Sequence, residues 1–164
     1  MTLINTISTE LEKLNSEYSG KKFILAISGG VDSMVLLDGF NKLTLNIEVA
    51  HFNFQLRAEE SDADEELVKQ ICSKNNISFN KNTADTNAYA AEKGLSIQEA
   101  ARELRYNWFF NLLKEKSADY VVTGHHADDS IETFFINLLR GSGIKGLCGI
   151  KNTQQIVRPL LLNL

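Results

Sequence analysis

The segment "FILAISGGVDSMVLLDGF" (residues 23–40) runs from apolar residues through two glycines into a second apolar stretch. Gly29 and Gly30 allow the backbone to turn sharply and to approach a ligand closely, and Ser28 and Ser33 add hydroxyl groups beside them. The loop lies where a buried strand would lead into a helix, and a helix N-terminus favours an anion. The segment therefore predicts a phosphate-binding loop, and the alternative is an ordinary turn with a serine cap.

This loop lacks the lysine of the G-x-x-x-x-G-K-[ST] pattern, which reaches the β and γ phosphates in γ-phosphoryl transfer. A loop that holds the β,γ-pyrophosphate as a leaving group would instead suit attack on the α phosphate of ATP. Asp32, near the end of the loop, could hold a Mg²⁺ ion that neutralises the departing pyrophosphate. Alternatively, Asp32 lies in the first helical turn only because of the helix dipole.

A second cluster of polar residues occurs in "TGHHADDSIET" (residues 123–133), which follows another apolar run. On a helix, Asp128 and Glu132 are four residues apart and Asp129 and Glu132 three apart, so the carboxylates can gather. With no cysteine nearby, this oxygen-rich set suits Mg²⁺ better than zinc. In the alternative reading, Asp128 caps the helix, the other acids are solvated, and the two histidines belong to a loop.

The segment "SIQEAARELRYNWFFNLL" (residues 96–113) predicts a long helix that begins with a capping box of Ser96 and Glu99. Its expected buried stripe is Ile97, Ala100, Ala101, Leu104 and Trp108. Arg102 and Arg105 could project from one side of this helix toward the ligand-binding edge of a sheet, where the planar guanidinium suits phosphate. A surface ion pair between Glu99 and Arg102 is the alternative.

The whole chain alternates between strand-like and helical patterns. The expected helices cover residues 3–14, 32–42, 63–74, a short segment around residue 88, a long segment from residue 96, and 128–140. The expected strands cover residues 23–27, 47–52, 77–79 and 119–124, followed by an extended piece at 155–162. This order predicts an α/β fold, a doubly wound, Rossmann-like and mostly parallel sheet of about five strands, with helices on both faces.

The composition limits the remaining possibilities. A chain of 164 residues with 43% hydrophobic content suffices for one core, so we expect residues 1–164 to form a single domain. The net charge of −4 provides no general attraction for a nucleic acid. Cys72 and Cys148 form neither a CxxC motif nor a disulfide framework, which indicates a reduced, cytoplasmic protein. No run approaches the roughly 18 apolar residues of a membrane span, so no membrane partner is expected.

"SGGVDS" resembles the SGGxDS signature of the PP-loop ATP pyrophosphatases, which have the adenine nucleotide alpha hydrolase-like fold. Four further segments resemble, in order, blocks of the tRNA(Ile)-lysidine synthetase family: "AHFNFQLRAEESDADEE" (50–66), "EAARELRY" (99–106), "TGHHADDSIETFFINLLRGSGIKGL" (123–147) and "RPLL" (158–161). Phe54 departs from the family pattern because many relatives carry a histidine there, so that position receives no catalytic role. Members usually continue into RNA-binding regions, so we expect a truncated chain that lacks C-terminal RNA-binding domains.

The resemblance implies a two-step reaction. The enzymes adenylate O2 of the wobble cytidine of isoleucine tRNA and release pyrophosphate, and the amino group of free L-lysine then displaces AMP at C2 to give lysidine. ATP and Mg²⁺ are the implied cofactors, and the resemblance also allows a homodimer. Isoleucine tRNA is the implied RNA partner, whose tight binding would need the C-terminal domains.

The resemblance also assigns roles to individual residues. The ATP-binding set is Ser28, Gly29, Gly30, Val31, Asp32, Ser33, Ala50, His51 and Gly124. The catalytic set is Asp32, Arg102, Arg105, His125, Asp128, Asp129 and Glu132. Asp32 and Asp128 are the expected metal ligands. Asn53, Arg57 and Arg140 are the expected RNA or phosphate contacts.

Two other functions share parts of this pattern. A PP-loop enzyme that inserts sulfur into tRNA would need catalytic or cluster-binding cysteines. A noncatalytic ATP-binding module would explain the loop but not the polar cluster at residues 125–132. A pyrophosphate-release assay with ATP, lysine and isoleucine tRNA, each omitted in turn, would separate the three.

Overall fold

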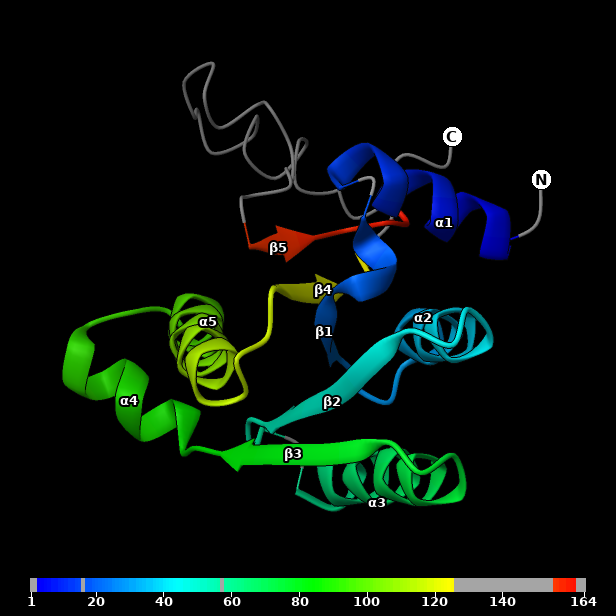
Figure 1. The fold of residues 1–164 in the computed structure, drawn as a ribbon. Coiled ribbons are helices and arrows are strands. Elements are labelled where there is room, and N and C mark those ends of the chain that lie inside the picture. Colours follow the sequence, from blue (N-terminus) through cyan, green and yellow to red (C-terminus); the bar gives the residue numbers. More distant parts are fainter. Residues whose placement is uncertain (1–2, 16, 57, 126–154, 162–164) are drawn as a thin grey trace.

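The computed structural model describes residues 3–15, 17–56, 58–125 and 155–161 (Figure 1). Its strands are β1 (Lys22–Ala26), β2 (Asn46–Asn53), β3 (Ser78–Thr83), β4 (Tyr120–Thr123) and β5 (Ile156–Val157). Its helices are α1 (Leu3–Leu14), the short 3₁₀ helix η1 (Tyr18–Gly20), α2 (Val31–Lys42), α3 (Ala58–Lys74), α4 (Thr86–Lys93) and α5 (Ile97–Glu115).

The described strands form one parallel sheet in the order β3-β2-β1-β4-β5. From β1 the chain passes through α2 to β2 and through α3 to β3, which lies at one edge. It then returns through α4 and α5 to β4, on the other side of β1. The strand order therefore reverses between β1 and β4, and in open parallel sheets ligands bind outside the carboxyl ends of the strands at such a point.

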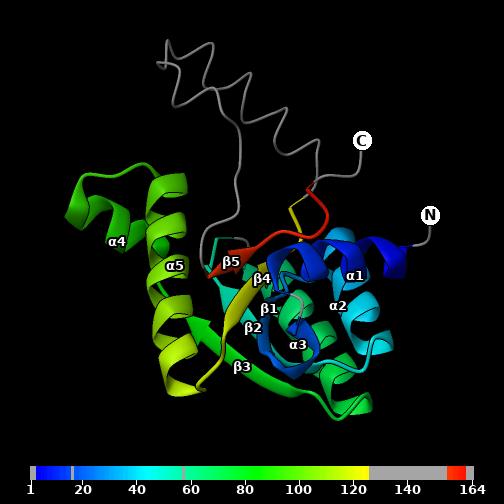
Figure 2. The same ribbon diagram turned by 45° about the horizontal axis from the view of Figure 1, so that its top comes forward.

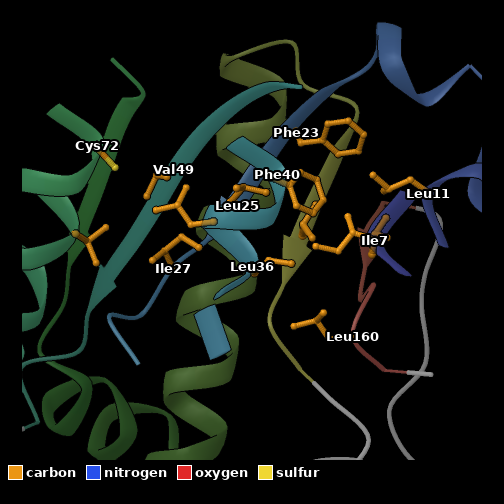
Figure 3. Packing of buried hydrophobic residues seen from close by; sticks show 14 residues of the cluster. Ile7, Leu11, Phe23, Leu25, Ile27, Leu36, Phe40, Val49, Cys72 and Leu160 are labelled. Atoms are coloured by element: carbon orange, nitrogen blue, oxygen red, sulfur yellow. The ribbon is translucent and has the colours of Figure 1, made fainter. Parts of the chain in front are cut away.

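Helices cover both faces of the sheet, as predicted (Figures 1 and 2). Phe23 and Leu25 of β1 point into a core shared with α1, α2 and α3, and Figure 3 shows this packing. Ile24, between them, points to the opposite face and packs against Phe109 and Leu112 of α5. Because both faces are buried, the strand is continuously apolar, which is why the sequence predicts a parallel sheet.

The start of α5 confirms the predicted capping box. Ser96 Oγ accepts a hydrogen bond from the Glu99 amide at 3.3 Å, and the Glu99 carboxylate accepts one from the Ser96 amide at 3.0 Å. In the predicted buried stripe, Ala100 is buried as predicted, but the prediction is wrong at Ile97, which is 39% exposed. The N-terminal half of α5 lies beside α4 (Figure 2), and the C-terminal half of α5 packs against the sheet.

The other element boundaries mostly agree with the sequence patterns. Helix α3 begins at residue 58, earlier than the predicted residue 63. The expected extended piece at 155–162 is a strand only at residues 156–157, and residues 159–161 form a turn. The helix predicted over 128–140 lies outside the described residues. None of the described helices has the length and apolarity that crossing a membrane would require.

Candidate functional site

The glycine loop (residues 28–33) joins β1 to the first turn of α2 and is held by its own serines. Ser33 Oγ donates to the Gly30 carbonyl at 2.8 Å and accepts from the Ser28 amide at 3.2 Å. Ser28 Oγ accepts from the Gly30 amide at 3.3 Å. Both hydroxyls therefore shape the loop. An incoming phosphate would meet the first amides of α2, which have no carbonyl partners within the helix.

Gly29 is the residue in this loop that must be glycine. Its φ is +98°, in the region that L-residues rarely adopt. A Cβ at this position would also lie 2.8 Å from Cβ of Asp64, so the first turns of α3 pack directly against the loop. The sequence pattern predicts the glycine, but not its neighbour in α3.

The end of β4 closes the other side of the loop. A Cβ on Gly124 would lie 3.3 Å from both Cα and N of Ser33, so this glycine allows the strand end to approach α2 closely. The next residue, His125, has its Nδ1 2.8 Å from Thr123 Oγ1, and this contact orients the imidazole ring.

These segments enclose a hollow of about 220 Å³, which we call the central hollow. It lies at the carboxyl ends of β1 and β4, where the strand order reverses. Its lining residues are Ala26, Ser28, Gly30, Asp32, Ser33, Arg105, Phe109, Thr123, Gly124 and His125. Seven residues predicted from the sequence to belong to the site therefore meet here: Ser28, Gly30, Asp32, Ser33, Arg105, Gly124 and His125. Val31 is 77% exposed and does not line this hollow.

The two arginines of α5 occupy different places. Arg105 lines the central hollow, and its Nε is buried without a hydrogen-bond partner in the described part of the chain. Burial lowers the pKa of Arg105, and the nearby charges of Arg102 and Arg158 lower it further. Arg102 is exposed, and its Cζ lies 4.9 Å from the centre of the Tyr106 ring. Of the pair, only Arg105 faces the glycine loop.

Ala50 and His51 of β2 hold the residue that precedes the loop. The Ile27 amide donates to the Ala50 carbonyl at 3.0 Å. The ring of His51, which is only 3% exposed, donates from Nδ1 to the Ile27 carbonyl at 2.9 Å, since a carbonyl can only accept. Ala50 also lines a smaller hollow of about 50 Å³ beside the central one, together with Phe52 and Phe54. Contact of the Ala50 and His51 backbone with adenine stays a prediction.

Asn53 is buried, and its amide group bonds within the protein. Its Nδ2 donates to Asp62 at 3.1 Å and to Glu65 at 3.4 Å, and its Oδ1 accepts from the Gln55 amide at 3.0 Å. These bonds tie the end of β2 to α3. Its expected role as an RNA or phosphate contact stays a prediction.

Several predicted site residues lie outside the described residues: Arg57, Asp128, Asp129, Glu132 and Arg140. Their roles stay predictions. Within the described ranges, no group of three or more histidine, cysteine, aspartate or glutamate side chains could by itself hold a metal ion. Asp32 is therefore the one member of the predicted metal pair that the structure describes, and it lines the central hollow.

Tyr106 and Arg158, both near the site, received no role from the sequence. Arg158, just after β5, is only 3% exposed, and its guanidinium donates to the Tyr106 hydroxyl at 3.2 Å. A charged residue within the apolar segment "QIVRPLLL" was the available signal, because arginine is rarely buried without a partner. The sequence does not indicate that this partner belongs to α5.

Comparison with known proteins supports the same fold. The family model described as a PP-loop domain matches residues 3–163. The chain is 46% identical over 152 residues to a tRNA(Ile)-lysidine synthase of Bacteroides thetaiotaomicron, with 92% of this chain and 36% of that protein covered. It is 43% identical over 164 residues to the tRNA(Ile)-lysidine synthase of Porphyromonas gingivalis strain W83, with 98% of this chain and 36% of that protein covered. The chain thus spans about a third of the length of these relatives.

Solved structures show the fold at low sequence identity. A U34-tRNA thiolase from Methanococcus maripaludis matches with a TM-score of 0.69 and 19% identity, over 96% of this chain and 58% of that one. An NMN synthetase from Francisella tularensis matches with a TM-score of 0.66 and 18% identity, over 98% and 63%. Both matches extend over nearly all of this chain.

Proposed function

This chain belongs to the PP-loop domain family, and we propose that it is the catalytic domain of a tRNA(Ile)-lysidine synthase. In the proposed reaction, O2 of the wobble cytidine of isoleucine tRNA attacks the α phosphate of ATP, and pyrophosphate leaves. The amino group of free lysine then attacks C2, the bond between C2 and O2 breaks, and AMP leaves. The names of the relatives at 43–46% identity support this assignment over the other reactions of the fold.

The observation that carries the proposal is the central hollow, which unites the glycine loop, Arg105 and His125. The amides at the start of α2 would hold the β,γ-pyrophosphate, because no lysine stands in this loop for γ transfer. Arg105 lines the same space with its Nε buried, and a guanidinium is suited to phosphate oxygens. A triphosphate lying between loop and arginine would therefore be bound at both ends.

The donor set is compatible with Mg²⁺. Magnesium in such sites is held by one or two carboxylates together with substrate phosphates and water. Asp32 lines the hollow and would supply one carboxylate, and Asp128 is the proposed second ligand. When bound, the ion would neutralise charge on the departing pyrophosphate.

We assign the lysine side of the reaction to His125 and the acidic residues that follow it. His125 lines the hollow with its ring oriented by Thr123. Asp129 and Glu132, beside the proposed metal ligand Asp128, are proposed to receive the cationic substrate, because carboxylates attract the ammonium groups of lysine. Arg102, being exposed, is proposed to contact RNA rather than ATP.

The test follows release of pyrophosphate and of AMP with ATP, lysine and isoleucine tRNA each omitted in turn. We expect a single burst of pyrophosphate with ATP and tRNA, and AMP release only when lysine is added. Pyrophosphate release that needs no tRNA would contradict the proposal and favour the adenylation of a small molecule.

The charge of this chain bears on its RNA binding. Binding to RNA depends on contacts from lysine and arginine to phosphate and weakens as salt rises, yet here 21 acidic residues outnumber 17 basic ones. We therefore expect these 164 residues to bind ATP and Mg²⁺ but to hold tRNA weakly, so that efficient modification needs further RNA-binding domains. Paired titrations with an ATP analogue and isoleucine tRNA at physiological salt measure this. Submicromolar, cognate-selective tRNA binding would refute it.

A sulfur-transfer function is disfavoured by the described cysteine. Cys72 of α3 points into the core and is 1% exposed, and burial raises its pKa to about 11. A thiol with this pKa is almost wholly protonated near neutral pH, whereas catalysis and metal binding need the thiolate. Cys148 lies outside the described residues.

A further inference from the structure

Three arginine side chains converge on Tyr106. Cζ of Arg102 lies 4.9 Å from the centre of the tyrosine ring, and Cζ of Arg105 lies 5.4 Å from it. Arg158 reaches the same side chain at its hydroxyl, to which it donates at 3.2 Å. Two of these arginines come from α5, and the third comes from the segment after β5, so the arrangement exists only in the folded protein.

The cluster concentrates positive charge beside the central hollow. Arg102 and Arg158 both act to lower the pKa of Arg105, in addition to the effect of its burial, because like charges oppose each other. The electron-rich face of the ring and the hydroxyl lone pairs of Tyr106 offset part of this repulsion. An anion in the hollow would offset more, and Arg105 is the member of the cluster that lines it.

Arg105 also retains an unused donor. Its Nε is buried and makes no hydrogen bond within the described part of the chain. Buried polar groups are nearly always hydrogen-bonded, so an unpartnered donor of a cation facing a hollow indicates an absent acceptor. The glycine loop forms the other side of the same hollow, so this acceptor would lie close to the bound phosphates.

We propose that Tyr106 and Arg158 are positioning residues that hold the guanidinium of Arg105 against the phosphate that stays on the nucleoside when pyrophosphate leaves. This inference rests on the proposed function. In the adenylated cytidine that phosphate is a diester with one negative charge, and it becomes the monoester AMP when lysine displaces it. The monoester carries nearly two charges at neutral pH, so a fixed cation there stabilises the departing group in the second step.

The two supports differ in what they fix. The Tyr106 ring carries the guanidinium of Arg105 on its face, and Arg158 fixes the ring by its hydroxyl. Removing the hydroxyl therefore leaves the contact between the ring and the Arg105 guanidinium but removes the hydrogen bond from Arg158. The variant Tyr106→Phe thus separates positioning by Arg158 from packing of the ring.

The test measures binding of AMP and of pyrophosphate, each alone with Mg²⁺, to the chain and its variants by calorimetry. Tyr106→Phe and Arg158→Gln should each weaken the binding of AMP about tenfold, which corresponds to about 1.4 kcal/mol. The affinity for pyrophosphate should stay unchanged within twofold. Arg158→Lys, which keeps the charge, should recover part of the loss. Equal losses for both ligands, or no loss for AMP in Tyr106→Phe, would overturn the proposal.

Tyr89→Phe is the matched control. Tyr89 lies on α4, and its hydroxyl donates to Glu103 at 2.7 Å, at the protein surface. Removing this hydroxyl should leave both affinities unchanged. Because Arg158 is buried, Arg158→Gln could unfold the chain, but Tyr106→Phe retains the ring and is checked for native circular dichroism.

A turnover measurement distinguishes this inference from the proposed function. In Tyr106→Phe, the release of AMP after addition of lysine should slow about tenfold, which is equivalent to about 1.4 kcal/mol in the activation barrier. The rate of the pyrophosphate burst should stay unchanged. AMP binding needs neither tRNA nor lysine, so a selective loss of AMP affinity supports the positioning role even if no lysidine forms. If lysidine forms and AMP affinity is unaffected, the proposed function stands and the positioning role fails.

Discussion

Replacing Gly29 by alanine tests whether the glycine loop depends on its backbone conformation and on its contact with α3. The φ of +98° is unfavourable for alanine, and such strained positions cost roughly 1–3 kcal/mol. The new Cβ would lie 2.8 Å from Cβ of Asp64, which moves only if the backbone of α3 shifts. Overpacking of this kind costs roughly another 1–3 kcal/mol. We therefore expect a loss of about 2–6 kcal/mol in the free energy of unfolding.

Gly94→Ala provides a matched control for the backbone contribution. Gly94 ends α4 with a φ of +66°, and a Cβ there would meet nothing within 4 Å. Its substitution should cost about 1–2 kcal/mol. Urea unfolding of both variants measures the difference, and titration with an ATP analogue reports the loop directly. If Gly29→Ala loses no more stability than Gly94→Ala, the reasoning about Asp64 is wrong.

A double variant isolates the contact itself. Asp64→Gly removes the overlapping Cβ and should by itself cost about 1 kcal/mol, because glycine is unfavourable within a helix. If the overlap contributes, Gly29→Ala combined with Asp64→Gly should be less destabilised than the sum of the single variants. Strict additivity would show that backbone strain alone accounts for the effect.

Three further predictions concern catalysis, the cysteines and acid stability. Asp32→Ala should lower adenylation by more than about a hundredfold without unfolding the chain, since a bound metal supplies several kcal/mol; activity close to wild type at saturating Mg²⁺ would exclude the metal role. Cys72→Ser should cost about 1–3 kcal/mol of stability for its buried hydroxyl, yet turnover should persist in it and in the double variant with Cys148→Ser; loss of turnover in a well-folded double variant would revive the sulfur-transfer alternative. Burial raises the pKa of Glu48, but hydrogen bonds, chiefly from Lys22, outweigh burial and hold that pKa below the ordinary 4.5. The ionised Glu48 therefore stabilises the fold above pH 4.5, and this contribution is lost as the pH falls. Glu48→Gln should therefore flatten the acid side of the stability curve measured by urea unfolding, and an unchanged slope below pH 4.5 would count against the pair.

The sequence alone determined the features that depend on neighbouring residues. The glycine loop, the capping box of α5 and the alternation of strands and helices are each specified by a few consecutive side chains and their backbone preferences. The parallel sheet with two buried faces follows from apolar strands joined by helices. The predicted strands and helices therefore agree with the structure to within a few residues for most of the described chain.

Only the tertiary structure decided which residues meet. The order β3-β2-β1-β4-β5 places the end of β4 beside the glycine loop and so brings Arg105 and His125 to Asp32. Helix α5 turns Arg102 outward and Arg105 toward the hollow, and the spacing of the two arginines in the sequence could not show which of them faces the site.

The inward and outward orientation of polar residues was decided in the same way. Asn53 and His51 bond inward, and Arg158 joins α5 from the other end of the chain. A hydrogen bond or ion contact between distant segments depends on strand order and packing, and a local pattern carries no information about either. The chemistry of the loop can therefore be predicted from its own residues, whereas the side chains that complete the site are selected by the way the sheet is assembled.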